Sequence, residues 1–392
     1  MKRKSTFQRG YLPMKKRNAA LLVGNGLSIA SDLDLNLSNI TNEVLQRIED
    51  ASGGEIVKAI KNIATNTLPD GNKSDEDFEK LVGAFGTQTA TLEYLNSLAK
   101  LADPDNLEIQ KAIKLTRQFA RQIRDTGTSY VLEVIAERSI ARPHNLTVPN
   151  ALVNAAKSAF QGNVTFGNLN YDTVLLAAMI DSCKTEFADM GHGWRTTKVD
   201  FCGRERDMSE LRRSTSDFPD DRRVRLLHLH GSLTYWKSTE SGAYFKVPKD
   251  LLKDGSAWES FRSLSASHKK SSALPTVVLA SSNQKTKDAA EFPFSLAYSM
   301  FSKGLKESDH WVIVGYSFRD EPVNSALRSE FMSRTVKPKV LVVTYGTDPE
   351  VEDIERHLGW GEEDGCSDGW LTIDRDGASG MTDRPIWSQF IS

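Results

Sequence analysis

The sequence predicts an α/β fold in which a parallel sheet carries helices on both faces and a large helical subdomain is inserted. Three observations lead to this fold class. Short apolar runs recur along the chain and are typical of buried strands. Stretches with apolar residues at helical spacing lie between them. Glycine and short polar residues directly follow several of the apolar runs, as expected where the strands of an open α/β sheet end.

The composition is that of an ordinary globular protein. The chain has 392 residues, of which 39% are hydrophobic and 26% are charged, and this length predicts two domains or one domain with a large insertion. A net charge of −2 does not favour direct binding to nucleic acid or to a membrane surface. No apolar run approaches the roughly 18 residues of a membrane span, and no signal peptide is recognisable, so we expect a cytoplasmic protein.

The N-terminus and the cysteines add two expectations. Residues 1–17 carry seven basic side chains and no acidic one, which predicts a solvated, flexible tail. Cys183, Cys202 and Cys366 are far apart and form no Cys-x-x-Cys pair. The sequence therefore supports neither a disulfide framework nor a structural zinc site, and we expect no metal.

A glycine turn follows the first predicted strand, which covers residues 18–23. The turn reads Gly24-Asn25-Gly26-Leu27-Ser28, and glycines in such a turn let the backbone approach a phosphate at the start of a helix. Ile29, however, stands where the full dinucleotide fingerprint has its third glycine. An ordinary turn between a strand and a helix explains the segment equally well.

Residues 38–160 are predicted to form the inserted helical subdomain. Ile40, Val44, Leu45 and Ile48 share one face of a helix, and similar spacing continues later in this region. Such apolar stripes indicate a packed core rather than a cofactor site.

Three short polar side chains mark the end of the next predicted strand, at residues 163–166. They are Asn168, Asn170 and Asp172, and a helix is predicted directly after them. An amide and a carboxylate fixed at this edge could hold the hydroxyl groups of a sugar. Alternatively, Asn170 and Asp172 only cap the turn and the helix, with Asp172 as the N-cap.

A histidine follows the strand predicted at residues 224–229. It belongs to the segment His230-Gly231-Ser232, and a histidine at a strand end beside glycine is expected to be exposed enough to titrate and to meet a ligand. A structural role is the alternative. The polar stretch before this strand, residues 203–223, is predicted to be an exposed loop, and residues 236–273 a hairpin or lid-like insertion.

The last part of the chain supplies three further strand candidates. They lie at residues 275–280, 311–314 and 340–344, and the second of them leads into Gly315-Tyr316-Ser317. Residues 350–392 are expected to pack at an edge of the sheet. The glycine turn, Asn-x-Asp, His-Gly-Ser and Gly-x-Ser thus all follow strands, and in a parallel sheet they would meet at one edge.

This combination of segments resembles the sirtuin family, in particular the bacterial sirtuin-like (Sir2-like domain), NAD-consuming proteins of anti-phage defence. The segments that carry the resemblance are residues 24–28, 168–172, 230–232 and 315–317, which are spread over most of the chain. The resemblance implies a Rossmann-like NAD-binding domain. We expect it to consist of residues 18–37 and 161–349, with the helical subdomain inserted between them.

The resemblance also implies roles for single residues. Those implied to bind NAD are Gly24, Asn25, Gly26, Ser28, Asn168, Gly315 and Ser317. Within this set the first two glycines and Ser28 would hold the pyrophosphate, and the last two residues would line the adenosine side. Asn170 and Asp172 would surround the nicotinamide ribose, and His230 would be the catalytic base.

Three departures from the family pattern refine the expected reaction. Asn25 stands where the family has an alanine. The arginine-containing segment that follows the glycine turn in the family is not recognisable in this sequence. The zinc-ribbon cysteines of the deacetylating sirtuins are missing, which argues against lysine deacylation. Water is then the expected acceptor, so the resemblance implies an NAD glycohydrolase that forms nicotinamide and ADP-ribose.

Loss of NAD kills the host cell, so the resemblance implies a regulated enzyme that acts in abortive infection. We expect control through a homo-oligomer or a separate partner, for instance a HerA-like ATPase. Two other functions stay open, an ADP-ribosyltransferase and a non-catalytic sensor of NAD or ADP-ribose. The presence of both Asn170 and His230 favours catalysis over sensing.

Overall fold

The computed structural model describes the chain from residue 16 to its end, except for residues 56, 59–60, 63–91, 93, 142–144, 254, 267–271 and 280–281. Most of the predicted basic tail, residues 1–15, lies outside the described residues. The same holds for part of the predicted helical subdomain.

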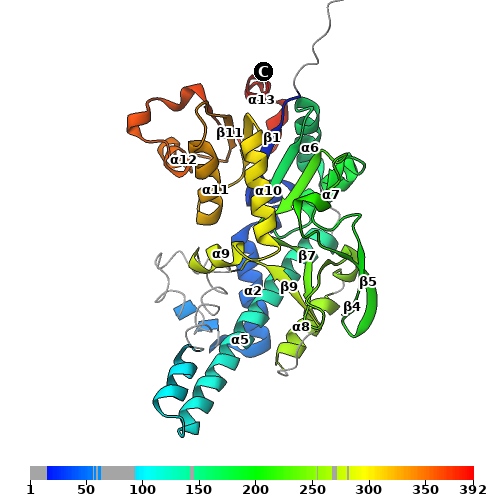
Figure 1. Ribbon diagram of the computed structural model, residues 1–392, viewed down its shortest axis with the longest axis vertical. Helices are drawn as coiled ribbons and strands as arrows, with labels where there is room; N and C mark the ends of the chain where they lie inside the picture. Colours follow the sequence, from blue (N-terminus) through cyan, green and yellow to red (C-terminus); the bar gives the residue numbers. More distant parts are fainter. Residues whose placement is uncertain are drawn as a thin grey trace, which may run out of the picture.

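A parallel sheet of seven strands organises the upper part of the molecule in Figure 1. All its neighbouring strands pair in parallel. From one edge to the other the strands are β12 (Leu371–Asp374), β11 (Lys339–Val343), β10 (His310–Val314), β1 (Ala19–Val23), β2 (Val164–Asn168), β6 (Val224–His228) and β3 (Phe187–Ala188). The strands β1, β10 and β11 consist almost entirely of apolar residues because side chains on both faces are buried, as in sheets that are covered twice.

Helices cover both faces of this sheet. Alternate residues of β1 enter two different apolar cores: Leu21 and Val23 enter one, and Leu22 enters the other. The first core is completed by α1 (Asn25–Ser31), α6 (Thr147–Ala159), α7 (Val174–Cys183) and α13 (Pro385–Phe390). The second is completed by α10 (Phe294–Glu307), α11 (Glu321–Met332) and α12 (Val351–Leu358). The predicted Rossmann-like fold class is confirmed.

A second, antiparallel sheet lies in the lower part of the view (Figure 1), and the sequence did not predict it. Its strands are, in order, β4 (Thr196–Phe201), β5 (Arg204–Glu210), β8 (Tyr244–Lys246), β7 (Gly231–Ser238) and β9 (Ala273–Val277). The prediction of an exposed loop is wrong for the residues of β5. Only Met208 of this strand is buried, so its charged side chains face solvent although its backbone is paired.

Three of the helices in the lower part share a core with the second sheet. They are α2 (Leu37–Ser52), α5 (Leu107–Ala136) and α8 (Ser256–Ala266). Trp236 and Trp258, from β7 and α8, lie at its centre with ring centroids 5.2 Å apart. Helix α9 (Ser282–Ala289) lies between the upper and lower parts and packs against α10 and α11 (Figure 1).

Single turns connect these elements. The 3-10 turns are η1 (Leu33–Leu35), η4 (Thr215–Asp217), η5 (Lys249–Leu251), η6 (Glu362–Asp364), η7 (Ser367–Gly369) and η8 (Met381–Asp383), and η3 (Glu137–Ala141) is a π-helical turn after α5.

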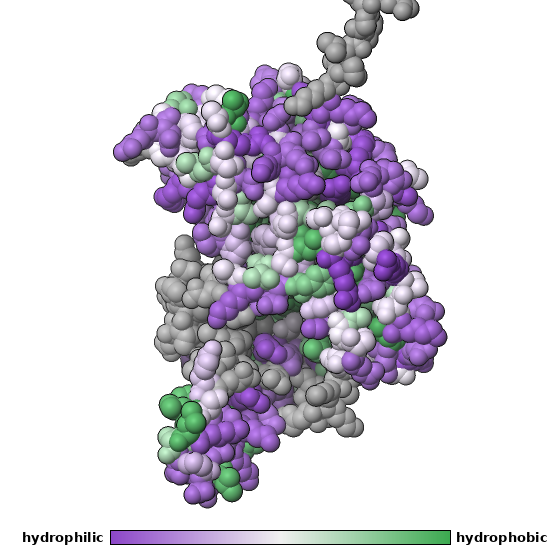
Figure 2. Space-filling view, in the orientation of Figure 1, coloured by the Kyte–Doolittle hydropathy of each residue, from purple (hydrophilic) through white to green (hydrophobic). Residues whose placement is uncertain are grey.

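The surface in the view of Figure 2 is mostly hydrophilic, with apolar side chains gathered at the lower tip. Tyr94, Leu98, Leu101 and Leu107, which lie where residues 94–102 lead into α5, are among the exposed apolar side chains. Across the described part of the chain, no helix is both long and apolar enough to cross a bilayer.

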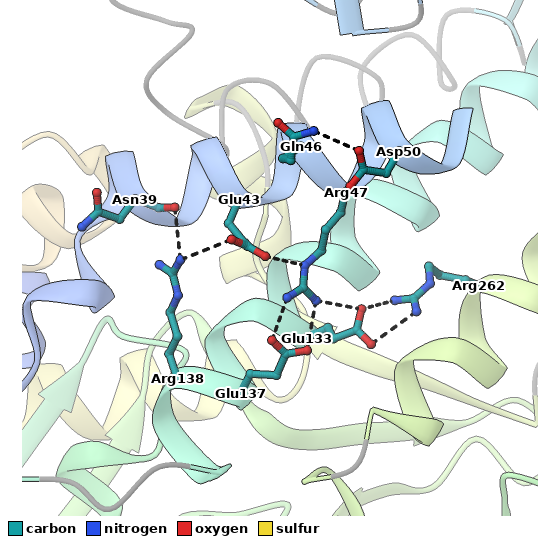
Figure 3. A network of polar contacts seen from close by, with 9 residues as sticks. All are labelled: Asn39, Glu43, Gln46, Arg47, Asp50, Glu133, Glu137, Arg138 and Arg262. Carbon is teal, nitrogen blue, oxygen red and sulfur yellow. Dashed lines mark hydrogen bonds and ion pairs between the residues drawn. The ribbon is translucent and has the colours of Figure 1, made fainter. Parts of the chain in front are cut away.

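An ionic network joins α2 to α5 and α8 (Figure 3). Arg47 contacts Glu137 at 2.7 Å and Glu133 at 3.4 Å, and Glu133 also binds Arg262 at 2.5 Å. The hydrogen bond to Glu137 and the charges nearby outweigh partial burial and raise the pKa of Arg47 above its usual value. Glu133 is thus a carboxylate that two arginines share, and its side chain is only 10% exposed.

Replacing Glu133 by alanine should lower the free energy of unfolding by about 3 kcal/mol, because two largely buried arginines would lose their common counter-ion. Glu43→Ala is the matched control. Glu43 also contacts Arg47, but 42% of its side chain is exposed, so its loss should cost less than about 1 kcal/mol. Urea unfolding followed by tryptophan fluorescence measures both losses, and equal losses would contradict this assignment.

Candidate functional site

The loops predicted to carry the site meet at the carboxyl edge of the parallel sheet. Val23, at the end of β1, pairs with both Asn168 of β2 and Val314 of β10. Asn168 pairs in turn with His228 of β6. Four neighbouring strands therefore end at the same level, and the residues that follow them are brought together although they are up to about 290 positions apart in the sequence.

Asn170, Ser28 and Asp172 form one buried hydrogen-bonded cluster at this edge. The side-chain nitrogen of Asn170, Nδ2, donates to Ser28 Oγ at 2.8 Å and to the backbone carbonyl of Gly24 at 3.0 Å. Ser28 Oγ donates to Asp172 Oδ2 at 2.6 Å. The glycine turn after β1 is thereby fixed to the polar segment after β2. The hydroxyl of Ser28 is used in this internal contact, and its predicted contact with the pyrophosphate stays a prediction.

Asp172 divides its two carboxylate oxygens between two tasks. Oδ1 accepts a hydrogen bond from the amide of Val174, the first residue of α7, at 2.9 Å. Oδ2 is the oxygen that binds Ser28. Thr173, not Asp172, occupies the N-cap position of α7, so the predicted N-cap is wrong by one residue. Asp172 nevertheless accepts a hydrogen bond from the first backbone amide of α7, and through Ser28 it fixes the glycine turn to the segment after β2.

Asn168 lies beneath this edge and is fully buried. Its side-chain nitrogen, Nδ2, lies 3.2 Å from His228 Nδ1 and donates to the backbone carbonyl of Asn170 at 3.2 Å. Burial lowers the pKa of His228 to about 4, so this imidazole is neutral at physiological pH. The geometry gives both side chains a packing role below the site, and an NAD contact of Asn168 stays a prediction.

His230 is in the turn between β6 and β7, and the structure corrects its expected exposure. Only 6% of the residue is accessible, and its ring centroid lies 6.3 Å from that of Tyr171. Tyr171 stands between Asn170 and Asp172 in the chain, so the histidine lies near the segment that carries two residues of the polar cluster. The sequence could not show this burial, because β9 crosses beside the turn: the amide of Val278, just after that strand, donates to the carbonyl of His230 at 2.9 Å.

Two residues near His230 were missed. Asp320, in the loop after β10, places Oδ2 at 3.2 Å from His230 Nε2, and Lys285 of α9 donates to the same oxygen at 3.1 Å. We call His230, Asp320 and Lys285 the His230 cluster. An acidic residue shortly after Gly-Tyr-Ser was a usable signal for Asp320, since it follows a strand of the same edge. Nothing in the sequence around Lys285 indicates its position.

The glycines of the edge contact one another. A Cβ built on Gly24 would lie 2.5 Å from the carbonyl oxygen of Gly315, and one on Gly26 would lie 2.6 Å from Gly315 Cα. Gly315 itself has φ of +60°, which favours glycine. The missing side chain of Gly26 thus makes room for the loop after β10. The expected approach of a phosphate at Gly26 stays a prediction.

Gly26→Ala should lower the free energy of unfolding by about 1–3 kcal/mol, because the backbone of Gly315 cannot yield as a flexible side chain would. Gly369→Ala is the control, because a Cβ there meets nothing within 4 Å. Thermal melts of the two variants give the comparison. If the Gly26 variant is as stable as the control, the loops do not touch as described.

The remaining predicted residues lie along the same edge. Asn25 is half-buried at the start of α1, and Ser317 is exposed beyond Gly315. The part of the chain that the structure describes holds no group of three or more His, Cys, Asp or Glu side chains suited to a metal ion. Cys183 is buried and Cys202 and Cys366 are exposed, all as free thiols.

Comparison with known proteins yields a similarity at the level of structure. No family model matches the sequence, and no curated protein matches it. A solved structure from a study of the structural basis for the mechanism and regulation of Sir2 enzymes is similar over 96% of this chain and 91% of its own, with 12% identity and a TM-score of 0.33.

Proposed function

We propose that this protein is an NAD glycohydrolase, which cleaves NAD to nicotinamide and ADP-ribose. The observation that supports it best is that Asn170, Asp172 and Ser28 form one buried cluster at the carboxyl edge. The ring of His230 lies near that of Tyr171, between Asn170 and Asp172 in the chain. These are the residues on which the sequence resembles the sirtuin family. The edge is also where open α/β sheets bind nucleotides.

The proposed reaction gives separate roles to His230, Asp172 and Asn170. The bond between C1′ of the ribose and the nicotinamide nitrogen breaks, and its electron pair leaves with nicotinamide, which becomes neutral. Water forms the new bond to C1′, and its proton passes to the imidazole of His230 and then to solvent. Asp172 and Asn170 would hold the ribose hydroxyls while C1′ becomes positively charged.

Product analysis tests this proposal. NAD labelled in its adenosine half is incubated with the purified protein over a range of protein concentrations, and the products are separated by chromatography. We expect nicotinamide and free labelled ADP-ribose. Label that stays on protein would point instead to an ADP-ribosyltransferase. Tight NAD binding without any release of nicotinamide would point to a sensor.

The biological role that we propose is NAD depletion during phage defence. This part rests on the sequence resemblance, as do a homo-oligomer and a regulatory partner such as a HerA-like ATPase. In bacteria that express the protein, NAD should fall after infection with a phage that triggers it. The fall should be absent with the His230→Ala variant. An equal fall with that variant would exclude this role.

A further inference from the structure

The His230 cluster joins three separate parts of the chain: the loop after β6, the loop after β10 and helix α9. His230 and Asp320 each have side chains that are only 7% exposed, and that of Lys285 is 14% exposed. Nε2 of His230 is buried and has no aligned hydrogen bond among the described residues, although it lies 3.2 Å from Asp320 Oδ2. A buried ring nitrogen that faces a carboxylate needs an explanation.

The loop that carries Asp320 is held firmly in place. The hydroxyl of Tyr316 accepts from the amide of Asp320 at 3.2 Å and donates to Asn324 Oδ1 at 2.8 Å. Asn324 donates to the carbonyl of Phe318 at 2.7 Å, and Phe318 has a φ of +56°, which is rare outside glycine. A strained conformation fixed by several contacts is typical of residues that a site requires in one position.

The charges around the imidazole can be named. Burial raises the pKa of Asp320, but His230 and Lys285 more than offset it, so the pKa lies well below its usual value and the side chain is a carboxylate at neutral pH. Burial raises the pKa of Tyr298, on α10, and of Tyr316, so both phenols stay neutral. Tyr171 contributes a ring from the loop after β2.

We infer that Asp320 positions the imidazole of His230 for proton transfer and that Lys285 counterbalances the negative charge of Asp320. The inference rests on the proposed NAD hydrolysis and adds two positioning residues to it. A carboxylate at Nε2 favours the tautomer that carries its proton there. Nδ1 is then the nitrogen that accepts the proton from the attacking water.

A purely structural role for Asp320 is the alternative, since its Oδ1 accepts from the amide of Val323 at 3.2 Å and caps α11. Asp320→Asn separates the two roles. The asparagine oxygen can still cap the helix, whereas the charge that faces His230 is lost. Lys285→Met removes the opposite charge and keeps the length of the side chain.

The first test measures turnover of NAD against pH for the full chain and both variants. Because the base must be unprotonated, Asp320→Asn should move the acidic limb of the profile to lower pH and lower maximal turnover by about tenfold or more, with little change in KM. Lys285→Met should move the same limb to higher pH. The shift for Lys285→Met should be about 0.5–2 pH units, as Coulomb's law gives for a charge roughly 6 Å away. The shift for Asp320→Asn should be the larger one, because Oδ2 of Asp320 lies only 3.2 Å from Nε2 of His230.

The second test does not need activity. In the full chain labelled with ¹⁵N-histidine, the His230 signals are assigned with His230→Ala and titrated in both variants. We expect the Nε2–H tautomer and titrations displaced in opposite directions. A proton on Nδ1, or displacements that are absent or equal in sign, would overturn the inference. A protein that releases no nicotinamide would refute the proposed function while this titration still decided the inference.

Discussion

Replacing His230 by alanine is expected to lower the turnover of NAD by about 10²–10⁴-fold, the usual contribution of a positioned proton acceptor. The affinity for NAD should change little, because an imidazole supplies few of the contacts to the pyrophosphate and the adenine. Nicotinamide release gives the turnover, and calorimetry gives the affinity. A large loss of affinity with unchanged turnover would show that His230 binds the ligand and does not act as the base.

His228→Ala is the matched control, since it removes an imidazole two residues away. His228 is 1% exposed and packs its ring edge-on against Tyr235, with centroids 5.3 Å apart. Its loss should therefore lower the melting temperature and leave the turnover of the folded protein nearly unchanged. If His228→Ala abolished turnover in a well-folded protein and His230→Ala did not, the base would be misassigned.

Asn170→Ala should produce the second largest effect, a fall in turnover of about 10²-fold. The variant loses the hydrogen bonds that fix the loop after β1 to the segment after β2, namely those to Gly24 and Ser28. Asp172, which accepts a hydrogen bond from Ser28, would then hold the ribose less accurately. Product release measured at saturating NAD would show the fall as a change in kcat.

Asn150→Ala provides the comparison for this variant. Asn150 also donates through its amide nitrogen, to Asp181 at 2.8 Å, but the pair is exposed and lies on α6 and α7. Its loss should leave turnover within about twofold of the unmodified protein and stability within about 0.5 kcal/mol. Equal falls in turnover for the two asparagines would mean that the effect of Asn170 is not local.

The strands of the sheet centre could be predicted because they are buried on both faces. β1, β10 and β11 appear in the sequence as nearly continuous apolar runs, and β2 and β6 as mainly apolar ones. The structure places each of these strands within about two residues of its prediction. Once these strands are parallel, the residues after them must share an edge. The contact of Asn170 with Ser28, and the place of His230 at the same edge, could therefore be foreseen from their order along the chain.

The edge strands and the second sheet could not be predicted in the same way. β3 has two residues, and β12 pairs with β11 only because the chain returns from α12. β5 carries charges on its exposed face, so its sequence resembles a loop. These strands depend on pairing with distant segments, which local patterns do not encode.

The His230 cluster was hidden for a related reason. The role of Asp320 depends on which loop lies opposite it, and Lys285 reaches it from a helix far from both loops in the sequence. The packing reason for Gly26 could not be predicted either, since its neighbour Gly315 lies almost 290 positions away. Sequence patterns identify strand ends, whereas contacts between loops follow only from the folded chain.

The contact between the two glycine loops also limits how the edge can move. Gly24 donates to the carbonyl of Val314 at 2.9 Å, Gly26 to that of Gly315 at 3.1 Å, and Gly315 to that of Val343 at 2.8 Å. The hydrogen-bond ladder thus continues past the ends of β1 and β10. The loops should open only as one cooperative unit, and their amides should exchange with deuterium together and slowly. A nucleotide that reaches this edge would find it already ordered, so little of its binding energy would be lost in arranging the loops.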